Sequence, residues 1–475
     1  MFAKLQRVHF VGIGGIGMSG IAEVLLTLGY QVSGSDLRST PVTQRLASLG
    51  ATVFTGHLAE QVVGAEVVVT SSAVSADNPE VAEARRRHIP VIQRAEMLAE
   101  LMRLKYGIAI AGMHGKTTTT SMVGAVLQAG ELDPTIIVGG RVDALGSNAR
   151  FGSSQYLVAE ADESDRTFLK LSPIISVVTN LDREHLDTYR DLKDIEDTFA
   201  DFMSRVPFYG MVVACHDNDS LRRVLPRIQR RVVTYGTRDD SDFRISGVEN
   251  CAPGASPADA PVSPLSRFRV HLRGELLEEF ELHVPGMHNV LNATAAVAVG
   301  IGLEIAPSRV RQALAEFRGV DRRFQLKGRV DGVSVVDDYG HHPTEIQATL
   351  AAARQCGFRR IHVLFQPHRY TRTQALLNEF GAAFEAADSV LVLDIYPASE
   401  PPIAGVNGEA VAQRIQKLGG LPARYIGGLA EAAAEAAALA QAGDLILTLG
   451  AGNISQLGPQ VLDRLRARTL SAIRS

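Results

Sequence analysis

A glycine turn that contains a lysine and two threonines has the plainest chemistry in the sequence. Gly112-Met113-His114-Gly115-Lys116-Thr117-Thr118 follows an apolar, strand-like run and precedes a helical pattern. In such turns backbone N–H groups surround phosphates, the lysine neutralises charge and a threonine hydroxyl binds magnesium. The alternative is a helix N-terminus with threonine caps and an exposed lysine. The preceding strand favours phosphate binding, although Gly112 stands too close to Gly115 for G-x-x-x-x-G-K-T.

Acidic residues follow the next apolar strand. The run Tyr156 to Ala159 leads into Glu160, and three further carboxylates come directly after it, at Asp162, Glu163 and Asp165. A carboxylate at a strand end beside a phosphate loop supplies the oxygen that a nucleotide-bound Mg²⁺ needs. We therefore predict Glu160 as a metal ligand and expect some of the other three to be solvated. His185, which follows a further strand, is a candidate second ligand, although a lone histidine is more often structural.

A second glycine turn lies near the start of the chain. Gly12, Gly14 and Gly17 match G-x-G-x-x-G between a strand and a helix, and Asp36 ends the next strand. Small residues let the backbone approach a pyrophosphate at the helix N-terminus. NAD and any other diphosphate-linked nucleoside fit equally well, so the turn leaves the ligand open. The alternative is that the glycines only permit tight packing of strand against helix.

The elements that position these turns alternate between strand-length apolar runs and segments of helical period. This alternation predicts an α/β fold with mostly parallel sheets flanked by helices. The pattern restarts twice, so we predict three domains, at residues 1–105, 106–321 and 322–475. In the third, polar or glycine residues follow the strands and mark the edge where ligands bind in parallel sheets, namely Asp338, Gln366, Asp394 and Gly450.

Composition excludes several classes of protein. A chain of 475 residues is too long for one core. Its net charge of -4 gives no general attraction to nucleic acid or anionic membranes. No run approaches the roughly 18 apolar residues of a membrane span, and the first ten residues predict neither a signal nor a transit peptide. Three scattered cysteines argue against a disulfide framework, so a cytoplasmic location is expected.

With these residues in view, the chain resembles the Mur ligases of bacterial cell-wall synthesis. The resemblance extends over essentially the whole length and rests on ordered motifs, which are GIGGIGMSG from Gly12, HGKTTTT from His114, EADESD from Glu160, NLDREHLDTY from Asn180, PGMHNVLNATAA from Pro285, RRFQ from Arg322, DDYGHHPTEI from Asp337, QPHRYTRT from Gln366 and DIYPASE from Asp394.

The resemblance implies a Rossmann-like first domain for a UDP-sugar, a central P-loop-type ATPase domain and a Rossmann-like third domain for an amino acid. In the first domain it assigns contacts with the UDP-sugar to Gly12, Gly14, Gly15, Gly17, Asp36, Ser71 and Ser72. The dehydrogenase-like turn is then used without nicotinamide.

In the central domain the resemblance implies that Gly112 to Thr118 bind ATP, with Lys116 catalytic and with magnesium at Thr117, Glu160 and His185. Glu160 and His185 also count as catalytic through that metal. Asn289 and Asn292 match positions near the ATP base. Considered without the family, Asn289 is equally well explained as a helix cap.

In the third domain the resemblance assigns ATP contacts to Arg323 and Asp338, a catalytic role to His342 and substrate contacts to Tyr339, His368, Arg369 and Arg372. Arginine suits a carboxylate because its planar fork binds two oxygens. Two positions depart from the family pattern. Met113 replaces a common threonine and loses a hydroxyl, and Glu184 replaces a common aspartate and keeps the charge.

The implied reaction is the ATP-dependent, magnesium-requiring ligation of L-alanine to the carboxylate of UDP-N-acetylmuramic acid through an acyl phosphate, a cytoplasmic step of peptidoglycan synthesis. We expect a monomer or homodimer, with no nucleic-acid partner and no membrane insertion. Three alternatives remain: an NAD-dependent oxidoreductase, which leaves Lys116 unexplained; a non-catalytic nucleotide-binding module; and, inside the family, the recycling ligase that adds a murein tripeptide.

Overall fold

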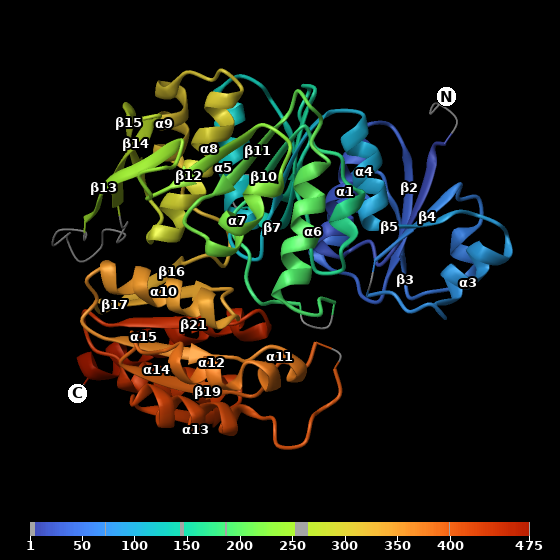
Figure 1. Cartoon of the computed structure of the whole chain (residues 1–475). Coiled ribbons are helices and arrows are strands. Elements are labelled where there is room, and N and C mark those ends of the chain that lie inside the picture. Colours follow the sequence, from blue (N-terminus) through green and yellow to red (C-terminus); the bar gives the residue numbers. More distant parts are fainter. Residues whose placement is uncertain are drawn as a thin grey trace. The chain divides into compact units, whose positions relative to one another are not determined.

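The computed structural model describes residues 5–71, 73–142, 147–185, 188–251, 265–398 and 400–474. They form three sheets (Figure 1). By their contacts the residues divide into two compact units. The first comprises Met1–Ser246, Arg269–Phe280 and Leu291–Glu316, and the second comprises Gly247–Phe268, Glu281–Val290 and Phe317–Ser475.

The first sheet is parallel, with the strand order β3-β2-β1-β4-β5. Figure 1 shows α1 and α4 on one side of these strands and α3 on the other. The strand order reverses between β1 and β4, and ligands bind beyond the carboxyl ends of strands at such a point. The elements are β1 (Arg7–Val11), α1 (Ile16–Thr27), β2 (Gln31–Asp36), α2 (Pro41–Ser48), β3 (Thr52–Thr55), β4 (Val67–Thr70), α3 (Pro79–Arg86), β5 (Val91–Gln93) and α4 (Arg94–Arg103).

The second sheet has ten strands in the order β15-β14-β13-β12-β11-β10-β6-β9-β7-β8. β6 lies between β10 and β9 and runs parallel to both. The strands are β6 (Tyr106–Ala111), β7 (Thr135–Val142), β8 (Ser147–Arg150), β9 (Tyr156–Glu160), β10 (Ile175–Val178), β11 (Met211–Cys215), β12 (Val232–Gly236), β13 (Phe243–Cys251), β14 (Leu265–Leu272) and β15 (Glu275–Leu282). The helices are α5 (Lys116–Ala129), α6 (Leu192–Ser204), α7 (Asp219–Val224), α8 (Met287–Gly302) and α9 (Pro307–Glu316).

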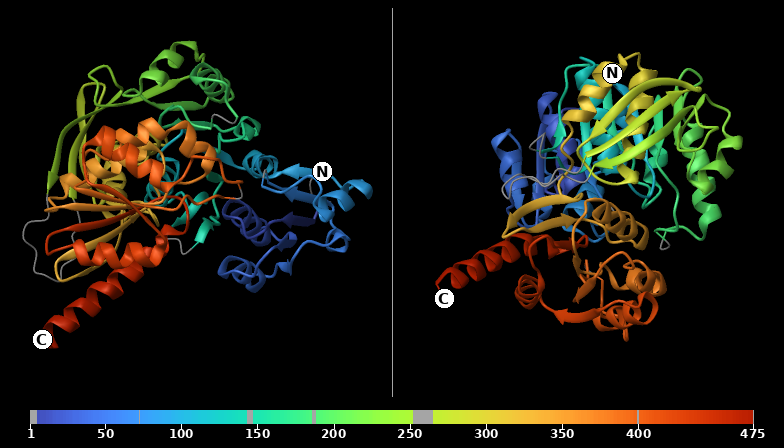
Figure 2. Two further views of the ribbon diagram at one scale, coloured as in Figure 1. Left: turned by 90° about the horizontal axis from the view of Figure 1, so that it is seen from below. Right: turned by 90° about the vertical axis from the view of Figure 1, so that its left-hand side faces the viewer.

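The third sheet has the order β16-β17-β21-β18-β19-β20, and β16 is its antiparallel edge strand. Its elements are β16 (Gln325–Val330), β17 (Val333–Asp338), α10 (Pro343–Gln355), β18 (Ile361–Phe365), α11 (Tyr370–Ala375), α12 (Leu377–Ala382), β19 (Ser389–Leu393), α13 (Gly408–Gly419), β20 (Ala423–Gly427), α14 (Leu429–Leu439), β21 (Leu445–Leu449) and α15 (Leu457–Arg474). Two buried apolar clusters cover its two faces, one with α10, α12 and α13 and one with α14 and α15. Figure 2 shows α15 as one long helix at the end of the chain.

The α/β class with parallel-dominated sheets is confirmed. The predicted strand Tyr156 to Ala159 is β9, which continues to Glu160. The explanation of Asn289 as a helix cap is wrong, because α8 already begins at Met287.

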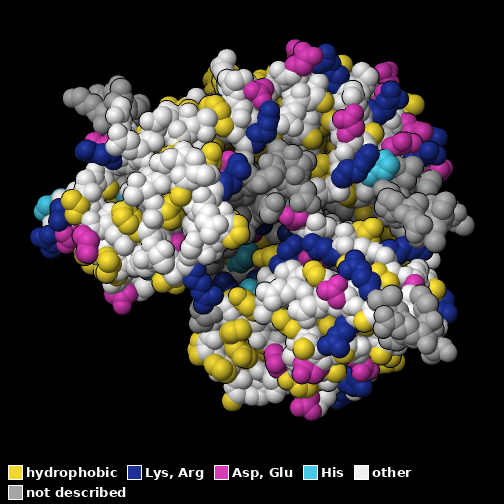
Figure 3. Space-filling model, turned by 180° about the vertical axis from the view of Figure 1, so that it is seen from behind, with side chains coloured by type: hydrophobic (Ala, Val, Ile, Leu, Met, Phe, Trp, Pro, Cys, Tyr) yellow, Lys and Arg dark blue, Asp and Glu magenta, His cyan; other side chains and the backbone are white. Residues whose placement is uncertain are grey.

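The surface agrees with the small net charge. On the face shown in Figure 3, basic and acidic side chains are interspersed. Among the residues that the structure describes, none of the helices combines the length and the apolar character needed to cross a bilayer.

Candidate active site

The Gly112–Thr118 turn joins β6 to α5, as predicted. Gly112 has φ 129° and Gly115 has φ 83°, conformations that residues with a side chain rarely adopt. A Cβ on Gly112 would lie 2.1 Å from Thr179 Oγ1, and one on Gly115 would lie 2.7 Å from Asn292 Oδ1. Both glycines are therefore required by backbone conformation and by space.

Residues at the end of β10 fix the shape of this turn. Asn180 Oδ1 accepts from the His114 N–H at 2.9 Å, and Asn180 Nδ2 donates to the His114 carbonyl at 3.0 Å. The Thr179 hydroxyl donates to the same carbonyl at 2.6 Å. Because α5 begins at Lys116, the first N–H groups of the helix are not used within it and its positive end faces the turn. The turn therefore has the geometry and the helix N-terminus that are typical of an anion-binding site.

Lys116 is held by the turn itself and by Glu163. Its Nζ donates to the carbonyls of Gly112 at 2.7 Å and Met113 at 3.2 Å, and to Glu163 Oε1 at 2.7 Å. Burial by itself would lower the pKa of Lys116, but Glu163 in particular outweighs it and raises the pKa. Lys116 is therefore a cation at neutral pH.

The sequence did not distinguish Glu163 from its acidic neighbours. Glu163 belongs to the acidic run expected to be partly solvated, yet its side chain is only 1% exposed. The same Oε1 that binds Lys116 lies 3.3 Å from His185 Nε2. The Tyr189 hydroxyl donates to the Glu163 carbonyl at 2.6 Å and holds the backbone in place. The structure thus brings Lys116 and His185 together through Glu163.

Two of the three predicted metal ligands, Glu160 and His185, lie on separate segments. Glu160 is the last residue of β9, opposite Ile110 of β6, and its Oε2 would lie 2.4 Å from a Cβ on Gly139. His185 has φ 54°; burial lowers its pKa, but the hydrogen bond to Glu163 and the charge of Glu184 raise it overall.

The residues at this edge suit a magnesium ion. Glu163 Oε2 is buried and has no hydrogen-bond partner among the described residues. Together with Glu160 and the hydroxyl of Thr117, at the start of α5, it offers the oxygen ligands that Mg²⁺ prefers.

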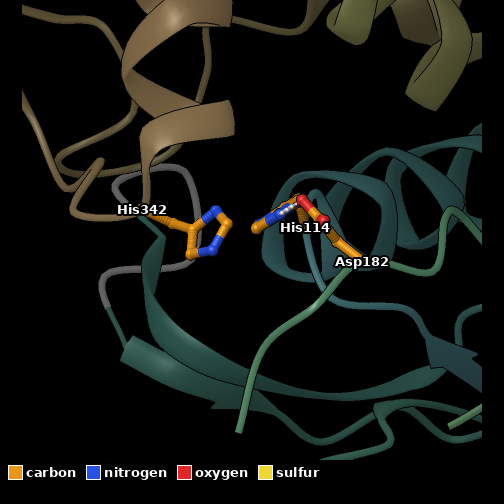
Figure 4. A group of neighbouring side chains, drawn as sticks. All are labelled: His114, Asp182 and His342. Atoms are coloured by element: carbon orange, nitrogen blue, oxygen red, sulfur yellow. Dashed lines mark hydrogen bonds and ion pairs between the residues drawn. The ribbon is translucent and has the colours of Figure 1, made fainter. Parts of the chain in front are cut away.

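His114 turns toward the segment after β10. Its Nε2 lies 3.1 Å from Asp182 Oδ2, a pair drawn in Figure 4, and its Nδ1 lies 3.9 Å from Glu184 Oε2. Met113 is buried, so its side chain serves packing. His342, also labelled in Figure 4, is the buried N-cap residue of α10 in the second unit.

The first glycine turn is held by β2. The N–H groups of Gly12 and of the following isoleucine both donate to the Ser35 carbonyl at 2.9 Å, and the Gly14 N–H donates to Asp36 Oδ2 at 2.9 Å. Asp36 therefore shapes the turn itself. Gly15 is the N-cap residue of α1. Ser71 directly follows β4, whereas Ser72 lies outside the described residues.

Arg94 is a residue of this region that the sequence analysis missed. A Cβ on Gly17 would lie 2.1 Å from Arg94 Nη1, so the third glycine of the motif makes room for the guanidinium. Arg94 Nη2 binds Asp162 Oδ2 at 2.7 Å. Burial opposes ionisation of Asp162, but Arg94 and then Lys116 hold its pKa well below the usual range. No local signal in the sequence distinguishes Arg94.

In the third sheet, Asp338 ends β17 and is buried. Its carboxylate accepts from the N–H groups of Phe324 and Gly340, both at 2.7 Å, yet burial raises the pKa of Asp338 to about 6. The neighbouring Tyr339 ring has the Arg323 guanidinium 5.1 Å from its centroid. Arg323 and Asp338, the two residues of this sheet predicted to contact ATP, therefore both lie next to Tyr339.

The segment after β18 brings His368, Arg369 and Arg372 together. His368 Nδ1 lies 3.2 Å from Arg372 Nη1, and the His368 ring stacks on Tyr396 with centroids 5.6 Å apart. Burial, the nearby His341 and the arginines lower the pKa of His368 to about 3. His368 is therefore neutral, and the arginines supply the positive charge.

Tyr396 and Glu400 were not predicted, although both lie in the DIYPASE motif. Glu400 accepts from Thr371 at the start of α11, through its N–H at 3.0 Å and its hydroxyl at 2.7 Å. This fixes the helix that carries Arg372.

The two predicted asparagines have different surroundings. Asn289 Nδ2 donates to the Pro285 carbonyl at 2.7 Å and is buried. Asn292, one turn further along α8, lies against Gly115 of the phosphate loop. Asn292 is thus the one of the pair that the structure places beside that loop.

Comparisons with known proteins agree with this arrangement. Residues 7–106 match the Mur ligase family catalytic domain, residues 110–300 the Mur ligase middle domain, and residues 322–452 the Mur ligase glutamate ligase domain. Two proteins named UDP-N-acetylmuramate--L-alanine ligase are similar over nearly their whole lengths. The one from Koribacter versatilis is 68% identical, with 99% of this chain and 100% of the relative covered; the one from Acidobacterium capsulatum is 62% identical, with 98% and 99% covered.

Solved structures show the same architecture. The UDP-N-acetylmuramate-alanine ligase MurC from Thermotoga maritima is 30% identical and superposes with a TM-score of 0.80, over 97% of this chain and 99% of that one. A murein peptide ligase from Psychrobacter arcticus shares the fold at 22% identity and a TM-score of 0.69, over 97% and 98% of the chains. The chain therefore has three α/β domains and belongs to the Mur ligase family.

Proposed function

We propose that this chain joins L-alanine to the carboxylate of UDP-N-acetylmuramic acid at the expense of ATP, releasing ADP and phosphate. The observation that carries the proposal is the preformed anion site at Gly112–Thr118, with Lys116 held as a cation by Glu163. Relatives at 68% and 62% identity bear the name of this activity, which supports the choice of substrates.

The site suits activation of a carboxylate. The carboxylate oxygen attacks the terminal phosphorus of ATP, a new P–O bond forms, and the bond to the ADP oxygen breaks. Attack of one anion on another requires positive charge around the phosphate, which Lys116 and the N-terminus of α5 supply. Magnesium, for which Thr117, Glu160 and His185 are the proposed ligands with Glu163 beside them, would neutralise further phosphate charge.

The second step is attack of the alanine amine on the acyl phosphate. The amine nitrogen bonds to the carbonyl carbon, the phosphate leaves with its electron pair, and the nitrogen loses a proton. Arg369 and Arg372 are the proposed partners of the substrate carboxylate, and the stacking of His368 on Tyr396 orients this segment. A neutral His368 leaves the arginine charge uncompensated for that carboxylate.

We further propose domain boundaries at residues 1–105, 106–321 and 322–475, a cytoplasmic location, and a monomer or homodimer. The first domain binds the UDP-sugar at the Gly12–Gly17 turn, and the ligase assignment leaves no role for NAD there.

Phosphate release tests this function directly. Purified protein with ATP, Mg²⁺ and UDP-N-acetylmuramic acid should release phosphate when L-alanine is added and should not respond equally to a murein tripeptide. Tripeptide-dependent release would identify the recycling ligase instead. A thermal shift with NADH and none with UDP-N-acetylmuramic acid would favour the oxidoreductase.

A further inference from the structure

A buried carboxylate in the first domain has no part in the mechanism described above. Glu80, in the first turn of α3, is 0% exposed, as are His9 of β1 and Ser35 of β2. Glu80 Oε2 accepts from His9 Nε2 at 2.6 Å and from the Ser35 hydroxyl at 2.8 Å, and Glu80 Oε1 lies 2.7 Å from His57 Nδ1. One carboxylate thus binds β1, β2 and the segment after β3.

Glu80 is ionised in this setting. Burial opposes its charge, but the hydrogen bonds from His9, Ser35 and His57 outweigh burial and lower the pKa of Glu80. Its position in the first turn of α3, next to the Asn78 cap, adds the favourable field of the helix N-terminus. Burying an ion is costly, and apolar side chains of similar volume often stabilise a core as well or better. We therefore explain the network by the position in which it holds the backbone, and not by a gain in the stability of the fold.

The geometry that the network controls is that of the Gly12–Gly17 turn. The Ser35 carbonyl accepts the N–H groups of Gly12 and Ile13, while the hydroxyl of the same residue binds Glu80. His9 lies three residues before Gly12 on the strand that leads into the turn. The strand that leads into the turn, β1, and the strand that accepts its N–H groups, β2, are thus both hydrogen-bonded to the same carboxylate.

We infer that Glu80 is a positioning residue for the diphosphate-linked substrate: it holds β1 and β2 in the register that keeps the Gly12–Gly17 turn in the conformation that receives the diphosphate at the N-terminus of α1. This rests on the proposed function, because it takes the turn as the UDP-sugar site. It predicts that weakening the network lowers affinity for the UDP-sugar without affecting use of ATP.

Two substitutions test the inference. Ser35→Ala removes the hydroxyl that binds Glu80 and keeps the carbonyl that holds the turn. Glu80→Gln keeps the size of the side chain but offers one oxygen where the carboxylate offers two. Glu83→Gln is the control, because Glu83 lies on the same helix and pairs with Arg86 and Arg87.

We expect both test variants to bind UDP and UDP-N-acetylmuramic acid about tenfold more weakly in calorimetry, the effect of losing one hydrogen bond to a charged group. The kcat and the KM for ATP should stay within about twofold of the unaltered protein, and Glu83→Gln should change neither. Hydrogen exchange at Gly12 and Ile13 should be faster in both test variants.

Unchanged UDP-sugar affinity in both variants overturns the inference. An equal fall of kcat at unchanged KM for every substrate also overturns the inference, because that result indicates only that less of the protein is folded. If the unaltered protein binds no UDP-sugar, the proposed function fails, and exchange at Gly12 and Ile13 alone decides whether Glu80 positions the turn.

Discussion

Replacing Lys116 by methionine should abolish ATP turnover and destabilise the protein, and these two effects can be separated. The substitution removes the charge but keeps an apolar side chain of similar length. It leaves Glu163, 1% exposed, without the cation 2.7 Å away. A carboxylate that loses its buried partner is strongly disfavoured, because it has neither water nor a counter-charge.

The size of the effect follows from burial. Breaking a fully buried ion pair by removing one partner costs about 3–5 kcal/mol. The Lys116 side chain is 18% exposed, so we expect the lower end, about 3 kcal/mol, or a fall of about 6–12 °C in the unfolding midpoint of the unit that contains the loop. Glu163→Gln should cost less, because Lys116 keeps the carbonyls of Gly112 and Met113.

The double variant Lys116→Met/Glu163→Gln separates stability from catalysis. With both charges removed, the midpoint should recover most of the loss seen in Lys116→Met, whereas ADP formation should stay absent. Calorimetry and coupled ADP detection measure the two quantities. Lys193→Met is the control, since Lys193 is an exposed lysine paired with Asp197 on α6, and it should change neither. A Lys116→Met protein as stable as the original, or ADP formation by the double variant, would refute the reasoning.

Two further predictions concern the turn and the third sheet. Gly112→Ala should lower ATP turnover at least about 100-fold while UDP-sugar binding stays intact, because the new Cβ would meet Thr179. Gly29→Ala is the control for the backbone cost, since Gly29 has φ 87° and open space around it. Equal losses of ATP turnover in the two variants would contradict the steric argument. For Asp338, burial raises the pKa from 3.8 to about 6, so its contribution to stability is full below about pH 4 and is lost as pH rises through about 6. Between pH 4 and pH 6 the unfolding free energy of Asp338→Asn should therefore fall by about 3 kcal/mol less than that of the unaltered protein, as measured by calorimetry. The same pH dependence in both proteins would show that another group dominates.

Local sequence patterns predicted the elements and the two turns well. Gly112 and Gly115 are required by backbone conformation, and both stand where the glycine spacing placed a phosphate loop. His368, which precedes α11, is in contact with Arg372 of that helix, only four residues later in the chain. These features depend on neighbours in the chain, so periodicity and motif spacing report them directly.

Long-range pairs could not be predicted in this way. Lys116 and Glu163 are 47 residues apart, and Arg94 and Asp162 are 68 apart. Nothing in an acidic run indicates which carboxylate turns inward, because that depends on the path of the loop over the sheet edge. Whether Asp36 binds a ligand or its own turn depends on a distance of 2.9 Å to the Gly14 N–H.

By itself, the sequence determined the α/β class, the glycine turns at β1 and β6, and the residue types available for phosphate chemistry. Only the tertiary structure decided that Glu163 holds the loop lysine, that Gly17 makes room for Arg94 and that Glu80 joins β1, β2 and the segment after β3. The physical reason is that hydrogen-bonded elements form from local geometry, whereas the burial and pairing of a charge depend on every segment that excludes water from it.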